Sequence, residues 1–125
     1  MKVSDLMVGD WVYVEKVGKP VRVESVGYTV FAGYEHFQEI DGSLYGIKPI
    51  PLTHEILEKN GWILKEFGCH KQFQYSFEDC DTEIILKIDY VNPNFIIPCF
   101  RVGFELKYVH ELQHLLNLCK IEIVL

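Results

Sequence analysis

The sequence has no cluster of basic residues and no long apolar run. Its 125 residues include 12 Lys and Arg against 18 Asp and Glu, which gives a formal net charge of −6. Nucleic-acid-binding domains usually carry a strongly basic face, so this balance argues against a nucleic-acid partner. No apolar stretch approaches the about eighteen residues that span a bilayer, and the polar start MKVSDL is unlike a secretory signal. We therefore expect a cytoplasmic protein without a membrane segment.

The cysteines lack the spacing of a metal or redox site. Four cysteines are scattered along the chain and none forms a C-x-x-C pair, so neither a zinc ribbon nor a thioredoxin-type motif is indicated. Glycine-rich phosphate loops and nucleophile elbows are also missing. In a cytoplasmic chain such cysteines are expected to be reduced and mostly buried. Because 49% of the residues are hydrophobic, the chain can form a packed globule, and we predict no cofactor.

The first fifty residues have the pattern of a small antiparallel β-structure. The runs VGDWVYVEK (8–16) and KPVRVESV (19–26) are rich in β-branched and aromatic residues, and the second alternates apolar and polar side chains. Turn signals such as Gly18 and the Asp41-Gly42 pair separate the runs. Four or five short strands joined by tight turns predict an SH3-like small barrel or a bent antiparallel sheet.

The rest of the chain mixes helices with further antiparallel strands. Thr53 is a suitable N-cap and Gly61 a suitable stop for a short helix within residues 49–62. Strands are expected from Trp62 to about Phe67 and in the runs KQFQYSFE, EIILKIDYV and NFIIPCFRVGFEL, followed by an amphipathic helix and a candidate last strand, IEIVL. We predict a single α+β domain over residues 1–125, with a β-rich portion at about 1–50 and an α+β portion at about 51–125.

The string HELQH, residues 110–114, matches the H-E-x-x-H motif of zinc hydrolases. Two histidines four residues apart lie on one face of a helix, so His110 and His114 can reach one zinc ion while Glu111 acts as general base. A catalytic zinc usually needs a third protein ligand. The glycine and histidine of the longer metzincin motif are replaced by Asn117 and Lys120.

The same residues fit an ordinary amphipathic helix. The helix would dock on a sheet through an apolar stripe made of Tyr108, Val109, Leu112, Leu115, Leu116 and Cys119. Its polar face, solvated or hydrogen-bonded, would then hold His110, Gln113, His114 and Asn117. We favour this interpretation, and keep as the alternative a minimal zinc-dependent hydrolase that uses His110 and His114 as ligands and Glu111 as catalytic base.

Aromatic residues are concentrated in YTVFAGYEHF, residues 28–37. On a small barrel they can form a binding platform or fill the core, and we expect at least half to be core. Since no basic residues are interleaved, a protein or peptide ligand is favoured over nucleic acid. The candidate binding residues are Tyr28, Phe31, Tyr34 and Phe37.

Two other groups of residues are interpreted as structural. Cys69 and His70 point to opposite faces if they lie in a strand, so we expect an inert thiol rather than a thiol–imidazole pair. The stretch EDCDTE (78–83) lacks the glycine and glutamate of a calcium-binding EF-hand loop and is expected to be an acidic turn.

The segments LMVGDWVYV, GKPVRVESVGYTVFAGYEHFQEI, IKPIPLTHEILEKNGW and KYVHELQHLLNLCKIEIVL together resemble a family of small uncharacterised proteins from gut anaerobes. These proteins are often encoded in prophage-like or mobile-element neighbourhoods. The resemblance covers most of the chain and is weakest in residues 67–105. The family has no established activity, so it implies no site residues, and its last helix is similar to a general Y-V-H-x-L-Q pattern. We therefore predict a non-enzymatic interaction or accessory module of phage or mobile-element origin.

Overall fold

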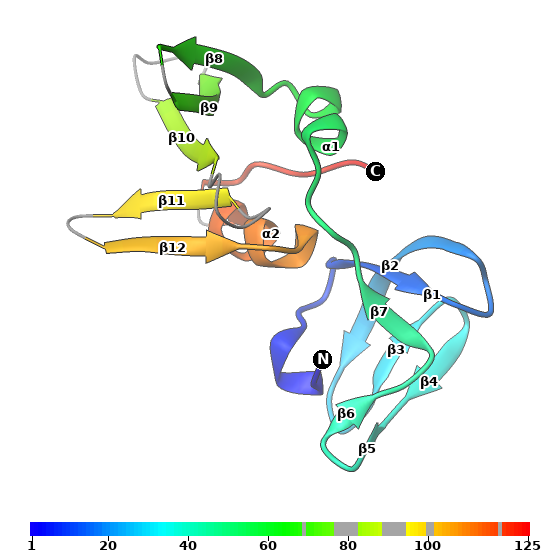
Figure 1. The fold of residues 1–125 in the computed structure, drawn as a ribbon. Coiled ribbons are helices and arrows are strands. Elements are labelled where there is room, and N and C mark those ends of the chain that lie inside the picture. Colours follow the sequence, from blue (N-terminus) through cyan, green and yellow to red (C-terminus); the bar gives the residue numbers. More distant parts are fainter. Residues whose placement is uncertain (69, 77–82, 89–94, 100–101, 118) are drawn as a thin grey trace. The chain divides into compact units, whose positions relative to one another are not determined.

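The protein consists mostly of antiparallel strands with two α-helices, which confirms the α+β class (Figure 1). The structure, a computed structural model, describes residues 1–125 except 69, 77–82, 89–94, 100–101 and 118. The chain divides into two compact units: residues 1–51, 108–123 and 125 form the N-terminal unit, and residues 52–107 and 124 form the second unit. The predicted portions differ from these units in one respect, because residues 108–123 belong with the N-terminal strands.

The N-terminal unit contains a five-stranded antiparallel sheet of order β4-β3-β2-β1-β7. A small hairpin, a 3₁₀ turn and the C-terminal helix complete the unit. The elements are η1 (Val3–Asp5), β1 (Trp11–Val14), β2 (Lys19–Val26), β3 (Val30–Ala32), β4 (Glu35–Phe37), β5 (Glu39–Ile40), β6 (Ser43–Leu44), β7 (Ile47–Pro49) and α2 (Val109–Asn117).

Strand β2 follows its sequence pattern closely. Its bounds are those expected, and Val23 is buried while its neighbours Arg22 and Glu24 are exposed. The register shifts between Val23 and Ser25, a bulge of the kind that bends a sheet. The apolar core that results consists of Leu6, Val12, Val14, Val23, Val30, Ala32, Phe37, Leu44 and Ile47.

The second unit joins a short helix to another five-stranded antiparallel sheet, of order β12-β11-β10-β9-β8. Thr53 caps the helix by accepting a hydrogen bond from the Ile56 N–H at 3.3 Å, and Gly61 follows it at φ +86°, as the sequence predicts. The run NFIIPCFRVGFEL contains two strands that pair antiparallel with each other, β11 and β12. The elements are α1 (His54–Lys59), β8 (Ile63–Phe67), β9 (His70–Ser76), β10 (Glu83–Ile88), β11 (Phe95–Cys99) and β12 (Val102–Leu106).

The prediction of a final strand at IEIVL is wrong. Residues 121–125, all of them described, form no strand. Side chains satisfy backbone groups of this segment instead. The indole Nε1 of Trp11 donates to the Ile123 carbonyl at 2.8 Å, and the Asn60 side chain both accepts from the Val124 N–H and donates to its carbonyl. Among the described residues, no helix has the length and apolar character to cross a membrane.

Candidate functional site

Helix α2 begins where the chain returns to the N-terminal unit. The Val109 N–H donates to the Ile50 carbonyl at 2.8 Å, and Tyr108 forms a β-bridge with Pro51. The Glu111 Oε1 accepts from the Tyr108 N–H at 2.9 Å. A carboxylate three residues into a helix commonly binds the backbone N–H of the N-cap in this way. One oxygen of the glutamate of the zinc motif thus contributes to the helix start.

The turn before β1 places one carboxylate inside the N-terminal unit. Gly9 has φ +92°, a conformation that favours glycine, and its N–H donates to the Val23 carbonyl at 2.8 Å. Asp10 then turns inward and is only 1% exposed, and its Oδ2 accepts from the Met7 N–H at 2.8 Å. A buried carboxylate needs further hydrogen bonds or a counter-charge.

His114 supplies that partner. Its Nε2 lies 2.6 Å from Oδ2 of Asp10, and the histidine side chain is 29% exposed. Because an ionised carboxylate only accepts hydrogen bonds, the Nε2 of His114 carries the proton. In the neutral ring the Nδ1 of His114 is then an acceptor. The pair has the geometry in which a carboxylate fixes the tautomer of an imidazole.

Gln113, one residue earlier, binds the same turn. Its Oε1 accepts from the Trp11 N–H at 2.8 Å, and its Nε2 donates to the Gly9 carbonyl at 3.1 Å. The side chain is 8% exposed. Sequence reasoning missed this contact, because a glutamine on a polar helix face has no signal that separates a buried amide from a solvated one. Gln113 and His114 together attach α2 to the turn before β1.

His110 is buried against the same surface. It is 5% exposed, and its buried Nδ1 has no hydrogen-bond partner within the described part of the chain. The ring stacks on Tyr108 with centroids 5.8 Å apart and meets the His114 ring edge-on at 5.7 Å. Burial lowers the pKa of His110 from its usual 6.5, although the carboxylates of Asp10, Glu111 and Asp5 act in the opposite direction.

The polar face of α2 was expected to be solvated or hydrogen-bonded, and Gln113 on that face is buried and hydrogen-bonded to the turn before β1 and to Trp11. His110 on the same face is buried as well. Two residues of the apolar stripe differ from the prediction. Leu115, assigned to the apolar stripe, is 37% exposed, and Cys119 is exposed and lies beyond the end of the helix. The helix thus buries both polar and apolar residues, and its polar contacts are made to the turn before β1 and to Trp11.

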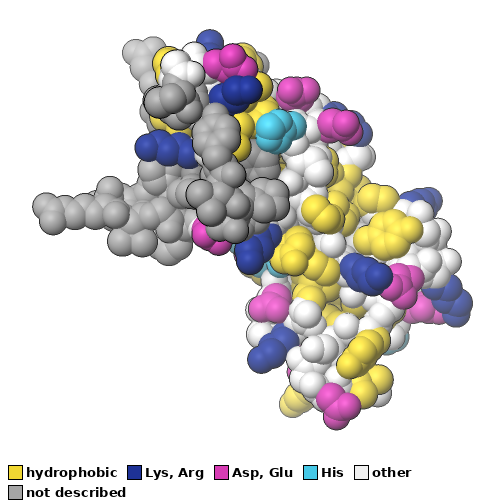
Figure 2. Space-filling view, viewed as in Figure 1, with side chains coloured by type: hydrophobic (Ala, Val, Ile, Leu, Met, Phe, Trp, Pro, Cys, Tyr) yellow, Lys and Arg dark blue, Asp and Glu magenta, His cyan; other side chains and the backbone are white. Residues whose placement is uncertain are grey.

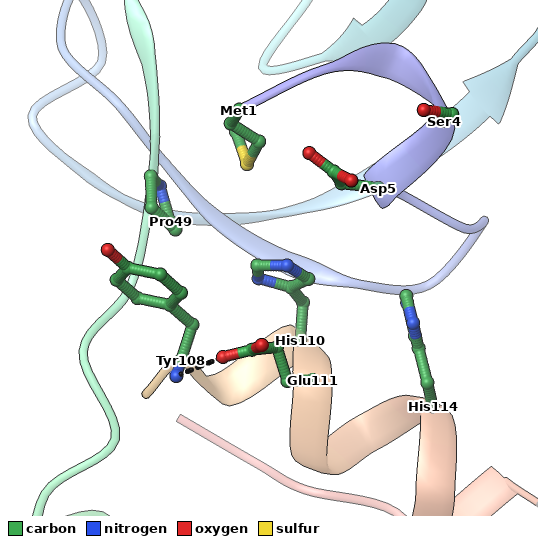
Figure 3. Close-up of a pocket in the computed structure, with 8 residues that line it drawn as sticks. All are labelled: Met1, Ser4, Asp5, Pro49, Tyr108, His110, Glu111 and His114. Atoms are coloured by element: carbon green, nitrogen blue, oxygen red, sulfur yellow. Dashed lines mark hydrogen bonds between the residues drawn. The ribbon is translucent and has the colours of Figure 1, made fainter. Parts of the chain in front are cut away.

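A cavity of about 530 Å³ lies beside α2, within the N-terminal unit. In Figure 3, Met1, Ser4 and Asp5 lie on one side of the His110 ring, and the side chains of Glu111 and His114 rise from the helix below it. Its lining residues are Met1, Ser4, Asp5, Pro49, Tyr108, His110, Glu111 and His114. Asp5 and Glu111 contribute carboxylates to this lining, and Met1 carries an ammonium group.

The proposed zinc ligands His110 and His114 are neighbours at this cavity, but Glu111 bonds the helix start and His114 bonds Asp10. Within the described residues, no group of three or more His, Cys, Asp or Glu side chains is arranged to hold a metal ion.

The four aromatic candidates do not gather in one place. Tyr28 and Tyr34 are almost fully exposed, but Tyr28 precedes the short strand β3 and Tyr34 follows it. Phe37 belongs to the core, and Phe31 is half-buried with its ring 4.7 Å from that of His36. On the face seen in Figure 2, hydrophobic side chains of the N-terminal unit alternate with lysine and acidic side chains. A binding role for these aromatics stays a prediction.

The remaining candidates fall on residues that are not described. Cys69 and residues 78–82 lie outside the described part of the chain, so the expectations of an inert thiol and of an acidic turn stay predictions. Comparisons of the chain with protein-family models, with curated proteins and with solved structures each found no match.

Proposed function

We propose that this chain is a non-enzymatic interaction or accessory module of the cytoplasm, of phage or mobile-element origin, with an SH3-like N-terminal unit. One observation carries the proposal: the polar residues of the HELQH helix are engaged in bonds within the N-terminal unit. Gln113 and His114 bind the turn before β1, and Glu111 binds the start of its own helix. We interpret this part of the motif as structural, because Gln113 and His114 attach α2 to the turn before β1 and to Trp11.

The energetics of Asp10 support this interpretation. Turning His114 toward a metal ion through its Nε2 would leave a carboxylate that is 1% exposed without its imidazole partner. Breaking a buried pair in this way costs about 3–5 kcal/mol. A metal site built on this nitrogen would have to offset that loss.

Exposed aromatic side chains on the N-terminal unit favour a protein or peptide partner. Tyr28 is 102% exposed, Tyr34 is 91% exposed and Tyr45 is 61% exposed. Tyrosine is enriched in protein interfaces, where a large apolar ring carries a polar tip. With a net charge of −6, nucleic acid is the less favoured partner.

Site-specific photo-crosslinking tests the proposal. A photoreactive amino acid replaces Tyr34 in the full chain, expressed in its own cell, and replaces exposed Lys19 in a control chain. We expect one reproducible adduct of defined mass from position 34 that is absent from position 19. The same adducts from both positions, or none from positions 28, 34 and 45, would contradict an interaction surface at these tyrosines.

The alternative is a minimal zinc-dependent hydrolase, and the observation in its favour is that His110 and His114 line one cavity with ring centroids 5.7 Å apart. The residues present fit a zinc ion only in part, since two imidazoles are there but a third ligand is not among the described residues. Elemental analysis of untagged protein dialysed without chelator decides between the two. If the protein contains about one equivalent of zinc, loses it in His114→Ala and hydrolyses a peptide substrate, the hydrolase hypothesis is correct and the interaction-module proposal is wrong.

A further inference from the structure

We propose that the cavity beside α2 binds a guanidinium group. His110 lines the cavity and is only 5% exposed, and its buried Nδ1 has no hydrogen-bond partner among the described residues. In the tautomer with the proton on Nε2, this Nδ1 is an acceptor. Buried polar atoms in proteins are almost always hydrogen-bonded, so an orphaned one needs a reason. A ligand that donates a hydrogen bond at this position supplies it.

The other polar groups of the cavity point to a ligand with several donors. With the proton on Nε2, facing Asp10, the neutral form of the His114 ring presents its Nδ1 as a second acceptor. The Asp5 carboxylate lines the cavity as well, and one of its oxygens accepts from the Lys2 N–H at 2.8 Å. Figure 3 shows the Asp5 side chain on one side of the His110 ring and the helix on the other.

The charge of the site favours a cation. The carboxylates of Asp10, Glu111 and Asp5 are all near enough to His110 to act on its protonation. Two of these carboxylates, those of Asp5 and Glu111, belong to residues that line the cavity. None of the described lining residues is a lysine or an arginine. The ammonium group of Met1 is the one permanent cation among the described lining residues, against the two carboxylates of Asp5 and Glu111, so the lining favours a cationic ligand over an anionic one.

A guanidinium suits the site better than a metal ion or a simple ammonium. The donors that a metal ion requires are not arranged for it among the described residues. A guanidinium is planar and carries five N–H donors in a fixed fork, and it packs against aromatic faces such as that of Tyr108. The cavity volume of about 530 Å³ is within the range of small-molecule sites.

The guanidinium can belong to the arginine side chain of a protein or to a free small molecule. In the first case the inference rests on the proposed function, because the arginine is then part of the partner. In the second case it does not. Two probes separate these sources: a blocked peptide with one central arginine, and agmatine, which carries the same group without a peptide backbone.

Titration of the full chain followed by NMR tests the inference. The imidazole C–H signals of His110 and His114 report on the cavity, and those of the exposed His36 serve as an internal reference. We expect saturable shifts at His110 and His114 with the arginine peptide, with agmatine or with both. A peptide with citrulline in place of arginine keeps the shape but lacks the charge, and it is expected to bind about tenfold more weakly or not at all.

Two matched variants remove one negative charge each. Asp5→Asn keeps an oxygen that can accept from the Lys2 N–H, so η1 is preserved, and it is expected to weaken binding about tenfold. Glu24→Gln, at an exposed position of β2, is expected to leave the affinity within about twofold. Equal losses in the two variants, equal binding of the citrulline peptide, or no saturable shift with either probe would overturn the inference.

The failure of this inference and that of the proposed function are distinguishable. Zinc titrated in the same experiment identifies the hydrolase alternative if it shifts His110 and His114 at about one equivalent while the guanidinium probes do not. Agmatine that binds where the arginine peptide does not supports the cavity but assigns it to a free small molecule. Crosslinks at Tyr34 without any guanidinium binding would keep the interaction module and overturn the cavity inference.

Discussion

His114 lies against Asp10 although 104 residues separate them in the chain, and the two side chains are joined by a contact of 2.6 Å between Nε2 and Oδ2. The aspartate is 1% exposed, and the imidazole of His114 is its described side-chain partner inside the N-terminal unit. We therefore regard this pair as the main polar link between the first and the last elements of that unit.

Removal of His114 is expected to destabilise the N-terminal unit strongly. His114→Ala leaves the Asp10 carboxylate buried with the Met7 N–H as its remaining described bond, which should cost about 3 kcal/mol in the free energy of unfolding. Urea denaturation followed by Trp11 fluorescence, in a Trp62→Phe background, measures it. His36→Ala removes an exposed histidine and should change stability by about 0.5 kcal/mol or less. Equal effects of the two substitutions would show that the Asp10 contact contributes nothing.

Charge at position 113 is expected to be unfavourable. Gln113→Glu keeps an acceptor for the Trp11 N–H but loses the donor to the Gly9 carbonyl. A carboxylate oxygen of the new side chain would then face the Gly9 carbonyl oxygen. A loss of about 2–3 kcal/mol is expected at pH 7. Gln38→Glu, at an exposed position, is the matched control and should be nearly neutral. The pKa of the new glutamate, measured by NMR, should lie above the usual value, and an ordinary pKa would contradict the buried amide geometry.

Stability is expected to fall on mild acidification because of His110. Its pKa in the folded protein lies below 6.5, chiefly because the ring is buried. As the pH falls below 6.5, the unfolded chain takes up a proton at His110 while the folded chain does not, so the free energy of unfolding decreases until the folded pKa is reached. The neighbouring charges are Asp5 from η1, Asp10 from the turn, and Glu111 and His114 from α2.

An NMR titration checks this expectation directly. The ring signals of His110 should titrate at a pH below 6.5. The free energy of unfolding, measured at pH 7 and at about pH 5.5, should fall less in His110→Gln than in the parent chain. A His110 signal that titrates at or above 6.5 would contradict the buried, neutral ring.

Gly61 is expected to be required at the end of helix α1. At φ +86° an added Cβ is strained by the backbone conformation even though its nearest neighbour, Tyr75, is at an ordinary 3.9 Å. Gly61→Ala should therefore cost about 1 kcal/mol or more. Gly27→Ala is the control, because Gly27 lies outside the left-handed region and nothing is within 4 Å of the added carbon. Differential scanning calorimetry should show a lower Tm for Gly61→Ala alone.

Local features of the fold were predictable because their causes are local. The bounds of β2 follow from side-chain alternation, and the start and end of α1 follow from Thr53 and Gly61. The final strand was predicted wrongly, since IEIVL has β-propensity but its backbone groups are bonded by side chains such as that of Trp11. Propensity gives no information on which partner a segment finds.

The candidate site was predictable only in its composition. The HELQH string identifies His110, Glu111 and His114, but their partners Asp10 and Tyr108 are set by the fold. The burial of Gln113 depends on the turn at Gly9, which is 104 positions away. A one-dimensional motif gives the spacing of the side chains along a helix, whereas their chemistry depends on the surface that the helix covers.

The bridge between Pro51 and Tyr108 gives the chain the architecture of an insertion. The N-terminal unit is interrupted after residue 51 and resumes at residue 108, and the two cut ends are hydrogen-bonded neighbours. During synthesis, the first strands leave the ribosome well before helix α2. The Asp10 carboxylate can therefore pair with His114 only after residue 114 has been made. The intervening segment could therefore be exchanged for another of different length without moving the two ends that the bridge holds together.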